Sequence, residues 1–267
     1  MQLPLGYETR SRSVFTRIAI CVFCLLLSAA SLSALIGPAA AQGPTAPAAR
    51  FTVVLDAGHG GDDVGANLTT QTGSPEAEKD FTLALSIKLR SLLKARGMAV
   101  VTTRESDIAL DADRRAETAD QAAAQACLSL HAATTGAGVH LFLSSLPPAQ
   151  ASKFAPWKTA QAAWVPKSLA LAGVLNSALR HAGIPVTVGR TALTTIDSMA
   201  CPAVAIEVAP EANPDNSIGA NAPGVVDDPA YDVKIADALA AALVEWRSDG
   251  SVFKNSGQRG GENHELR

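Results

Sequence analysis

Four ionisable residues stand at or beside the ends of predicted helices and strands, and together they could bind and use a metal ion. They are His59, Glu78, His131 and Glu207. Two histidines and one carboxylate are a ligand set of catalytic zinc sites, which keep a coordination position open for water. A second carboxylate can then serve as the base. These residue types indicate a hydrolase that uses zinc.

His59 occupies a glycine-rich stretch directly after an apolar run. The run Phe51–Leu55 is followed by Asp56-Ala57-Gly58-His59-Gly60-Gly61. Open α/β sheets bind ligands just beyond strand ends, and glycines leave such a site accessible. The same pattern is also typical of a simple tight turn with a solvated histidine. The stretch alone leaves both interpretations open.

The other three residues also have ordinary structural explanations. Glu78 could be a favourable charge at a helix N-terminus, His131 a hydrogen-bonded histidine at a strand end, and Glu207 an exposed residue where a strand leaves the core. The compact HExxH motif of common zinc proteases does not occur in the chain. Spacing by itself therefore does not establish the metal site.

Strand-like and helix-like periodicities alternate along the chain, which predicts a single α/β domain with an open, mostly parallel sheet flanked by helices. The zinc site would lie at the strand ends. Three segments lack a regular pattern: a polar loop at 67–77, an insertion at 146–166 and a polar tail. We expect strands at 51–55, 98–103, 127–130, 139–144 and 203–208, and helices at 79–96, 110–124, 167–182 and 232–246.

The first 41 residues have the pattern of a secretory signal peptide. Three arginines precede the apolar run Ile18–Ile36, and Ala39-Ala40-Ala41 supplies a small-residue cleavage site. An uncleaved anchor is the alternative, because the run approaches the length of a membrane-spanning helix. We predict a signal peptide (1–41), a linker (42–50), a catalytic domain (51–248) and a disordered tail (249–267). The mature protein would be periplasmic or secreted, without a stable membrane anchor.

Charge and cysteine content narrow the functions further. The chain has 22 basic and 25 acidic residues, and cleavage would remove three arginines and Glu8, which leaves 19 and 24 and a net charge of −5. A basic surface for nucleic acid is therefore not expected. Cys127 and Cys201 would remain. They could pair in an oxidising compartment or lie as buried thiols in neighbouring strands.

An ordered series of motifs resembles the zinc-dependent N-acetylmuramoyl-L-alanine amidases of the family-3 type. The resemblance runs from about residue 51 to about residue 246. Its motifs are Val53–Gly61, Gly65-Ala66, Glu78-Lys79-Asp80, Thr103-Arg104 with Asp107 and Arg114, Ser129–Ala132, and Pro202–Glu207.

The resemblance implies a role for each of the four residues. His59, Glu78 and His131 would be the ligands of one zinc ion, and Glu207 would be the catalytic glutamate. The substrate would be peptidoglycan, cut at the amide between N-acetylmuramic acid and L-alanine. A non-catalytic zinc-containing peptidoglycan-binding module and a zinc peptidase of the stem peptide are the alternatives. Whether an activator protein acts on the enzyme is left open by the resemblance.

Several positions depart from the family pattern or invite a second interpretation. Ala57 replaces a usual proline, Ala133 replaces an asparagine, and the segment after Glu207 differs, which bears on the substrate groove more than on the metal. Arg190 could hold a substrate carboxylate or form a surface ion pair. The insertion at 146–166 is expected to line or cover the groove. The remaining histidines, expected to have no metal role, are His140, His181 and His264.

Overall fold

The computed structural model describes residues 50–70, 74–150, 156–211 and 225–259. The chain divides into Met1–Ala49 and Arg50–Arg267, and the described residues all belong to the second unit. The predicted signal peptide and the predicted linker, apart from Arg50, lie outside the described residues. Among the helices in the described ranges, none combines the length and apolar character needed to cross a bilayer.

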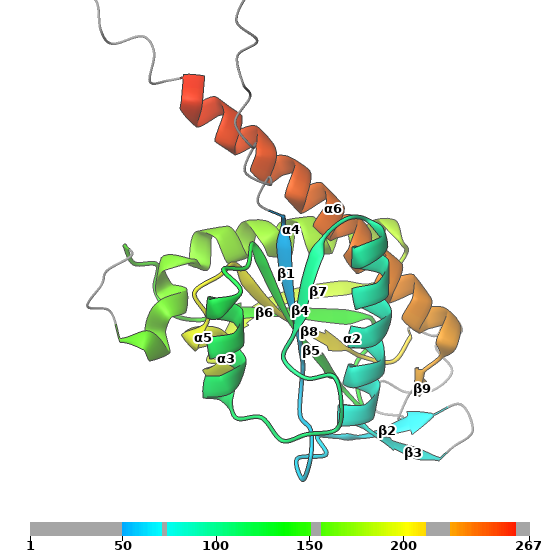
Figure 1. Cartoon of the computed structure of the whole chain (residues 1–267). Helices are drawn as coiled ribbons and strands as arrows, with labels where there is room; N and C mark the ends of the chain where they lie inside the picture. The colour runs from blue at the N-terminus through cyan, green and yellow to red at the C-terminus, as the bar shows by residue number, and fades with distance from the viewer. Residues whose placement is uncertain (1–49, 71–73, 151–155, 212–224, 260–267) are drawn as a thin grey trace, which may run out of the picture. The chain divides into compact units, whose positions relative to one another are not determined.

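A six-stranded sheet forms the centre of the domain (Figure 1). Neighbouring strands run parallel except β6 and β8, which are antiparallel. The predicted mostly parallel sheet is therefore confirmed. In sheet order the strands are β4 (Ala99–Thr102), β1 (Thr52–Ala57), β5 (Ala126–Ala132), β8 (Ala203–Val208), β6 (Val139–Ser144) and β7 (Val186–Thr191).

Helices cover both faces of this sheet because its strands are apolar on both sides. Val53 and Leu55 of β1 belong to the larger buried cluster, which packs against one set of helices, while Val54 belongs to a second cluster on the opposite face. Figure 1 shows α2 and α6 on one side of the strands and α3 and α5 on the other. The helices are α2 (Glu78–Ala95), α3 (Ala112–Gln121), α4 (Val165–His181), α5 (Thr194–Ser198) and α6 (Pro229–Arg259).

The helix that begins at Glu78 shows how the sequence pattern sets its packing. Phe81, Leu85, Leu89 and Leu93 recur on one side of α2 and are buried against the sheet. The helix gives way at Gly97, whose φ of +77° suits a residue without Cβ. The observed bounds lie within one residue of the predicted helix.

The prediction of an irregular polar loop at 67–77 is wrong, because part of this segment forms strands. β2 (Asn67–Thr70) pairs with β3 (Pro75–Ala77) and with β9 (Val225–Asp227) in a second, three-stranded sheet. The β2–β9 pairing joins segments far apart in sequence, so no local periodicity could reveal it. This sheet leads the chain directly into α2.

The last helix is longer than predicted. α6 begins at Pro229 and continues to Arg259, so helix occupies the first part of the segment predicted to be a disordered tail. The Gly-rich, polar composition of that segment argued against a packed core. A helix forms its hydrogen bonds within its own backbone, however, so it can continue through a segment of polar composition. Residues 260–267 lie outside the described residues.

A buried glutamine anchors the insertion at 146–166, which contains the 3₁₀ helix η2 (Trp157–Ala163). Gln161 is fully buried and donates to the carbonyl oxygens of Met199 and Cys201 at 2.9 and 3.0 Å. Its Oε1 accepts from Ser168 at 2.6 Å. The insertion is thus fixed to the segment before β8.

Cys127 and Cys201 form a disulfide that links the start of β5 to the residues preceding β8. Both side chains are buried in the smaller apolar cluster. Of the two arrangements left open by the sequence, the structure has the paired one. The bond joins β5, which carries His131, to the segment that leads into β8, which carries Glu207.

Replacing Gln161 tests its anchoring role. Gln161→Ala should lower the free energy of unfolding by about 2–3 kcal/mol, because buried carbonyls and the Ser168 hydroxyl lose their partner. Gln121→Ala removes an exposed glutamine from α3 and should change it by less than about 0.5 kcal/mol. Urea denaturation measures both, and equal effects would contradict the anchoring role.

Candidate metal centre

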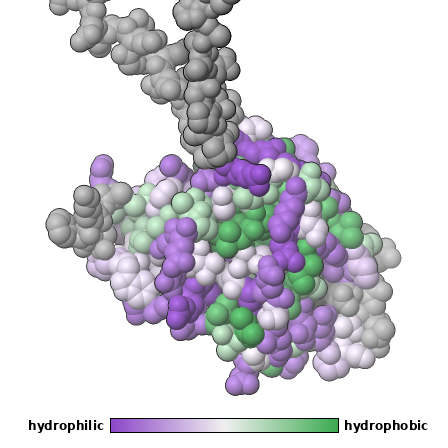
Figure 2. Space-filling view, in the orientation of Figure 1, coloured by the Kyte–Doolittle hydropathy of each residue, from purple (hydrophilic) through white to green (hydrophobic). Residues whose placement is uncertain are grey.

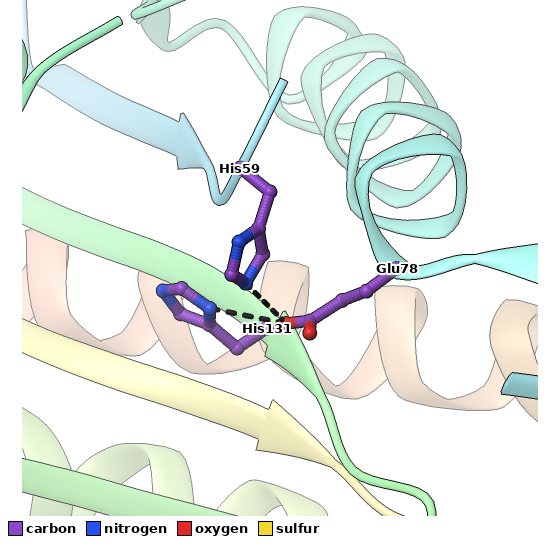
Figure 3. A group of neighbouring side chains, drawn as sticks. All are labelled: His59, Glu78 and His131. Carbon is purple, nitrogen blue, oxygen red and sulfur yellow. Dashed lines mark hydrogen bonds and ion pairs between the residues drawn. The ribbon is translucent and has the colours of Figure 1, made fainter. Parts of the chain in front are cut away.

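The first candidate ligand, His59, lies in a tight turn just beyond the end of β1 (Figure 3). Its φ of +62° is in the left-handed region, which costs a residue with a side chain about 1–2 kcal/mol. The turn is closed by hydrogen bonds between the backbones of Gly60 and Asp63. The imidazole Nδ1 lies 2.9 Å from both carboxylate oxygens of Asp63. This hydrogen bond is the main cause of the lowered pKa of Asp63.

Two glycines are required around this turn by close packing. A Cβ at Gly58 would lie 2.5 Å from Cε1 of His131 and 2.7 Å from the carbonyl oxygen of Leu130. A Cβ at Gly65, whose φ is +67°, would lie 2.7 Å from a Glu78 carboxylate oxygen. The glycines therefore allow the three candidate ligands to approach one another.

Two buried arginines hold the backbone of the His59 turn. Arg115 forms an ion pair with Asp56 at 2.7 Å and donates to the carbonyl oxygens of Ala57 and His59, each at 2.7 Å. Arg104 donates to the carbonyl oxygens of Ala57 at 3.0 Å and Gly58 at 2.9 Å. These bonds offset the strained conformation of His59 and fix the direction of its side chain.

Glu78 is the buried centre of the cluster. Its Oε1 lies 3.0 Å from His59 Nε2 and 3.1 Å from His131 Nδ1 (Figure 3). The backbone amides of Ala66 and Ala132 donate to its two oxygens at 2.9 and 3.0 Å. Burial raises the pKa of this carboxyl, but the hydrogen bonds and the nearby His59 outweigh burial and bring the pKa to about 2. Glu78 is therefore a carboxylate at neutral pH.

His131 stands near the end of β5 and reaches Glu78 from the sheet. Its other nitrogen, Nε2, lies 3.3 Å from the Ser129 hydroxyl, which donates to Asp56 at 2.7 Å. Parallel pairing of β1 and β5 sets Asp56 beside Ser129. The buried carboxylate of Asp56 thus binds Arg115, which holds the His59 turn, and Ser129, which contacts His131.

The three side chains fit a small divalent transition metal. Candidate ligand atoms of His59, Glu78 and His131 all lie within 4.8 Å of one another. A tetrahedral ion with bonds of about 2.0–2.1 Å would set neighbouring ligand atoms about 3.4 Å apart. The separations of the two histidine nitrogens from Glu78 Oε1, 3.0 and 3.1 Å, lie close to that value. Two imidazoles and one carboxylate are also a usual ligand set for such ions.

Glu207 is brought to the same place by sheet register. It lies on β8 opposite His131 of β5, so the two residues are neighbours in the sheet. Both belong to the lining of a pocket of about 610 Å³ that also contains His59 and Glu78. Within the described residues, no hydrogen bond or ion pair engages the Glu207 carboxylate. The structure thus brings together all four residues singled out from the sequence.

The pocket wall outside the cluster is mainly small and uncharged. It includes Ala133, one of the positions that depart from the family pattern, and the half-buried ring of Phe142. From the described part of the insertion at 146–166, no residue lines this pocket. That the insertion covers the groove stays a prediction. The hydroxyl-bearing lining residues are Ser129, Thr134, Thr135, Thr191, Thr194 and Thr195.

Other residues considered from the sequence lie apart from the cluster. His140 Nδ1 contacts the Thr187 hydroxyl, and His181 Nδ1 donates to the Ser177 carbonyl at 2.8 Å. Arg190 donates to the carbonyl oxygens of Ser144 and Leu146 rather than to a carboxylate. Among the described residues it has no ion-pair partner, and it does not line the pocket. His264 lies outside the described residues.

Three residues that support the cluster were given no role from the sequence: Asp56, which lay within the motif Val53–Gly61, and Asp63 and Arg115, which were not singled out. The motif series included the neighbouring Arg114, which is exposed and pairs with Glu117 on the surface of α3. Arg115 is the buried one, because it lies on the side of α3 that faces the sheet. Helical periodicity through 112–121 could have separated the two arginines.

The fold and the cluster define an α/β protein with a candidate metal centre at the ends of its parallel strands. The sequence model of a family described as N-acetylmuramoyl-L-alanine amidase matches residues 53–245. The chain therefore belongs to this amidase family, and the resemblance seen in the motifs is confirmed.

Solved amidases share the fold at low sequence identity. The catalytic domain of CwlV from Bacillus (Paenibacillus) polymyxa var. colistinus is 24% identical, with a TM-score of 0.54 over 74% of this chain and 98% of that one. Ami1 from Mycobacterium smegmatis is also 24% identical, with a TM-score of 0.55 over 74% and 97%.

A curated relative matches over a shorter stretch. The probable cell wall amidase LytH of Staphylococcus saprophyticus is 45% identical over 64 residues. The match covers 24% of this chain and only 21% of that relative.

Adjacent arginines of α3 offer a matched test of the support under the His59 turn. Arg115→Met should destabilise the protein by about 3–5 kcal/mol, because it leaves Asp56 charged and buried without its partner. Arg114→Met should change the free energy of unfolding by less than about 0.5 kcal/mol. Thermal and urea unfolding measure both variants. A similar loss in both would show that the buried pair has no special role.

The lowered pKa of Glu78 predicts a pH dependence of the metal-free protein. Because this pKa is about 2 in the folded state and 4.5 ordinarily, Glu78 stabilises the fold above pH 4.5. That contribution, on the order of 2–3 kcal/mol, should disappear as the pH falls from 4.5 toward 2. Urea denaturation across this range should show a smaller loss in Glu78→Gln than in the parent, whereas Asp80→Asn should follow the parent.

Proposed function

We propose that the protein is a zinc-dependent hydrolase that cleaves the amide between N-acetylmuramic acid and L-alanine in peptidoglycan. Its zinc ligands would be His59, Glu78 and His131, and Glu207 would be the catalytic residue. The observation that carries the proposal is the position of Glu207, whose carboxylate has no partner among the described residues, next to a metal-type cluster in one pocket. Family membership supplies the substrate and the bond.

The different surroundings of the two glutamates support different roles. Glu78 is held by two backbone amides and lies against both histidines, so its charge is fixed and its oxygens are committed. Glu207 is only partly buried and, within the described residues, is not engaged by another side chain. A general base must be free to accept and release a proton. Glu207 meets that requirement and Glu78 does not.

Amide hydrolysis then needs two proton movements at Glu207. A zinc ion, when bound, would supply the Lewis acidity that activates water and stabilises charge on the carbonyl oxygen. The Glu207 carboxylate takes a proton from the attacking water. The protonated Glu207 next delivers that proton to the nitrogen of the leaving L-alanine as the C–N bond breaks. Glu207 is thereby restored as a carboxylate.

The disulfide supports a site of action outside the cytoplasm. Disulfides persist in oxidising compartments such as the bacterial periplasm, and Cys127–Cys201 is a structural bond in the core. Peptidoglycan lies in the same cell-envelope space. Together with the predicted signal peptide, the bond favours a periplasmic or secreted enzyme.

Glu207→Gln tests the catalytic role. The variant should release peptides from purified peptidoglycan about 10²–10⁴ times more slowly than the parent, because the amide cannot accept the proton, while it binds the same amount of zinc. Glu211→Gln alters a glutamate just past β8 that pairs with Lys234, and it should digest at the parent rate. Removing metal with a chelator should stop digestion, and added zinc should restore it.

The reaction products distinguish the proposed activity from the two alternatives. Peptides with a free N-terminal L-alanine identify the amidase reaction, whereas new termini inside the stem peptide would identify a peptidase. A zinc-loaded protein that binds peptidoglycan and releases no peptide would be a binding module. Digestion by Glu207→Gln at the parent rate would contradict the role of Glu207.

A further inference from the structure

The two histidines of the cluster are held in opposite ways. Both face Glu78, His59 through Nε2 and His131 through Nδ1. The outward nitrogen of each ring has its own partner, which is Asp63 for His59 and Ser129 for His131. Each ring is therefore oriented by a residue that is not itself a candidate metal ligand.

Imidazole chemistry gives these outer contacts a consequence. A neutral imidazole binds a metal through its bare nitrogen while the other nitrogen keeps its proton. A carboxylate or a hydroxyl that accepts this outer N–H fixes the tautomer and the ring orientation, and a carboxylate also makes the inner nitrogen a stronger ligand. Asp63 can accept from Nδ1–H of His59 with either oxygen. Ser129 can accept from Nε2–H of His131, because its own proton goes to Asp56.

We propose that Asp63 is a positioning residue of the metal centre, which makes His59 bind zinc through Nε2. Ser129, backed by Asp56, makes His131 bind through Nδ1. The inference rests on the proposed metal site. Beyond the three ligands, it specifies which ring nitrogen of each histidine binds the metal. It also assigns a role to Asp63, which is not a ligand.

The surroundings of Asp63 suit a positioning role rather than a role in stabilising the fold. Its backbone exchanges hydrogen bonds with Gly60 at 2.9 and 3.3 Å, and its side chain also accepts from the Gly65 amide at 3.2 Å. The turn thus fixes Asp63 toward His59. Its side chain is nevertheless 68% exposed, so replacing it leaves no cavity in the core. Figure 2 shows one face of the molecule, on which hydrophobic patches are separated by hydrophilic residues.

The neighbouring Asp62 provides a matched control. It is also exposed, and no hydrogen bond or ion pair of its carboxylate occurs within the described residues. Asp62→Ala therefore removes the same charge from the same turn without removing the contact to His59. Any difference between the two variants reports the side-chain contacts of Asp63, which are those to His59 and to the Gly65 amide.

Zinc affinity is the first measurement. Competition with a chromophoric chelator should show that Asp63→Ala raises the zinc dissociation constant about 10–100-fold, while the metal-free variant still unfolds cooperatively. Asp62→Ala should match the parent. Asp63→Asn, which keeps an acceptor oxygen but loses the charge, should fall between. A parent-like dissociation constant for Asp63→Ala would overturn the proposal.

Long-range proton–nitrogen NMR of the zinc-loaded protein is the second measurement. The chain has five histidines, so the rings can be assigned by single replacements. His59 should keep its proton on Nδ1 and His131 on Nε2, and the opposite assignment for His59 would refute the inference. Both measurements use zinc without substrate. If zinc affinity follows Asp63 but peptidoglycan stays intact, the proposed function fails while this inference stands.

Discussion

The arrangement of the site depends on a buried ion pair between Asp56 and Arg115. Asp56 also accepts from Ser129 and Thr103, so one carboxylate joins β1, β5, the end of β4 and α3. Arg115 in turn donates to backbone carbonyls on both sides of Gly58. A buried pair of this kind is costly to break because either partner left alone would be an uncompensated charge. The turn that carries His59 is built on it.

The two histidines and Glu78 are held rigidly, whereas the Glu207 carboxylate is not held by other side chains among the described residues. Glu78 is committed on both oxygens, and burial together with hydrogen bonds keeps its conformation fixed. Glu207 lies on β8, the strand next to β5, and lines the same pocket. Among the described residues, it is not held by comparable contacts. The chain thereby separates a carboxylate suited to bind a metal from one suited to move a proton. The separation comes from their surroundings, since the side chains are identical.

Sheet topology explains why residues far apart in sequence meet. Parallel strands with helical crossovers place their carboxyl ends at one edge, and β1, β5 and β8 are consecutive in the sheet. Glu78 arrives differently, through β3 of the small sheet and the first turn of α2. Its backbone amide bonds to the Ala66 carbonyl at 2.9 Å, which fixes the start of the helix beside the His59 turn. Two separate sheets thus build the centre.

The sequence by itself determined the alternation of strands and helices, the four chemical residues and the family, because apolar periodicity and motif order are local properties of the chain. Strand bounds for β6 and β8 matched the prediction, since each is a short apolar run with clear ends. Only the tertiary structure decided the β2–β9 pairing and the disulfide. These features depend on long-range register and on which side of an element faces the core. Local patterns do not contain that information, because contacts between distant segments form only when the whole sheet is assembled.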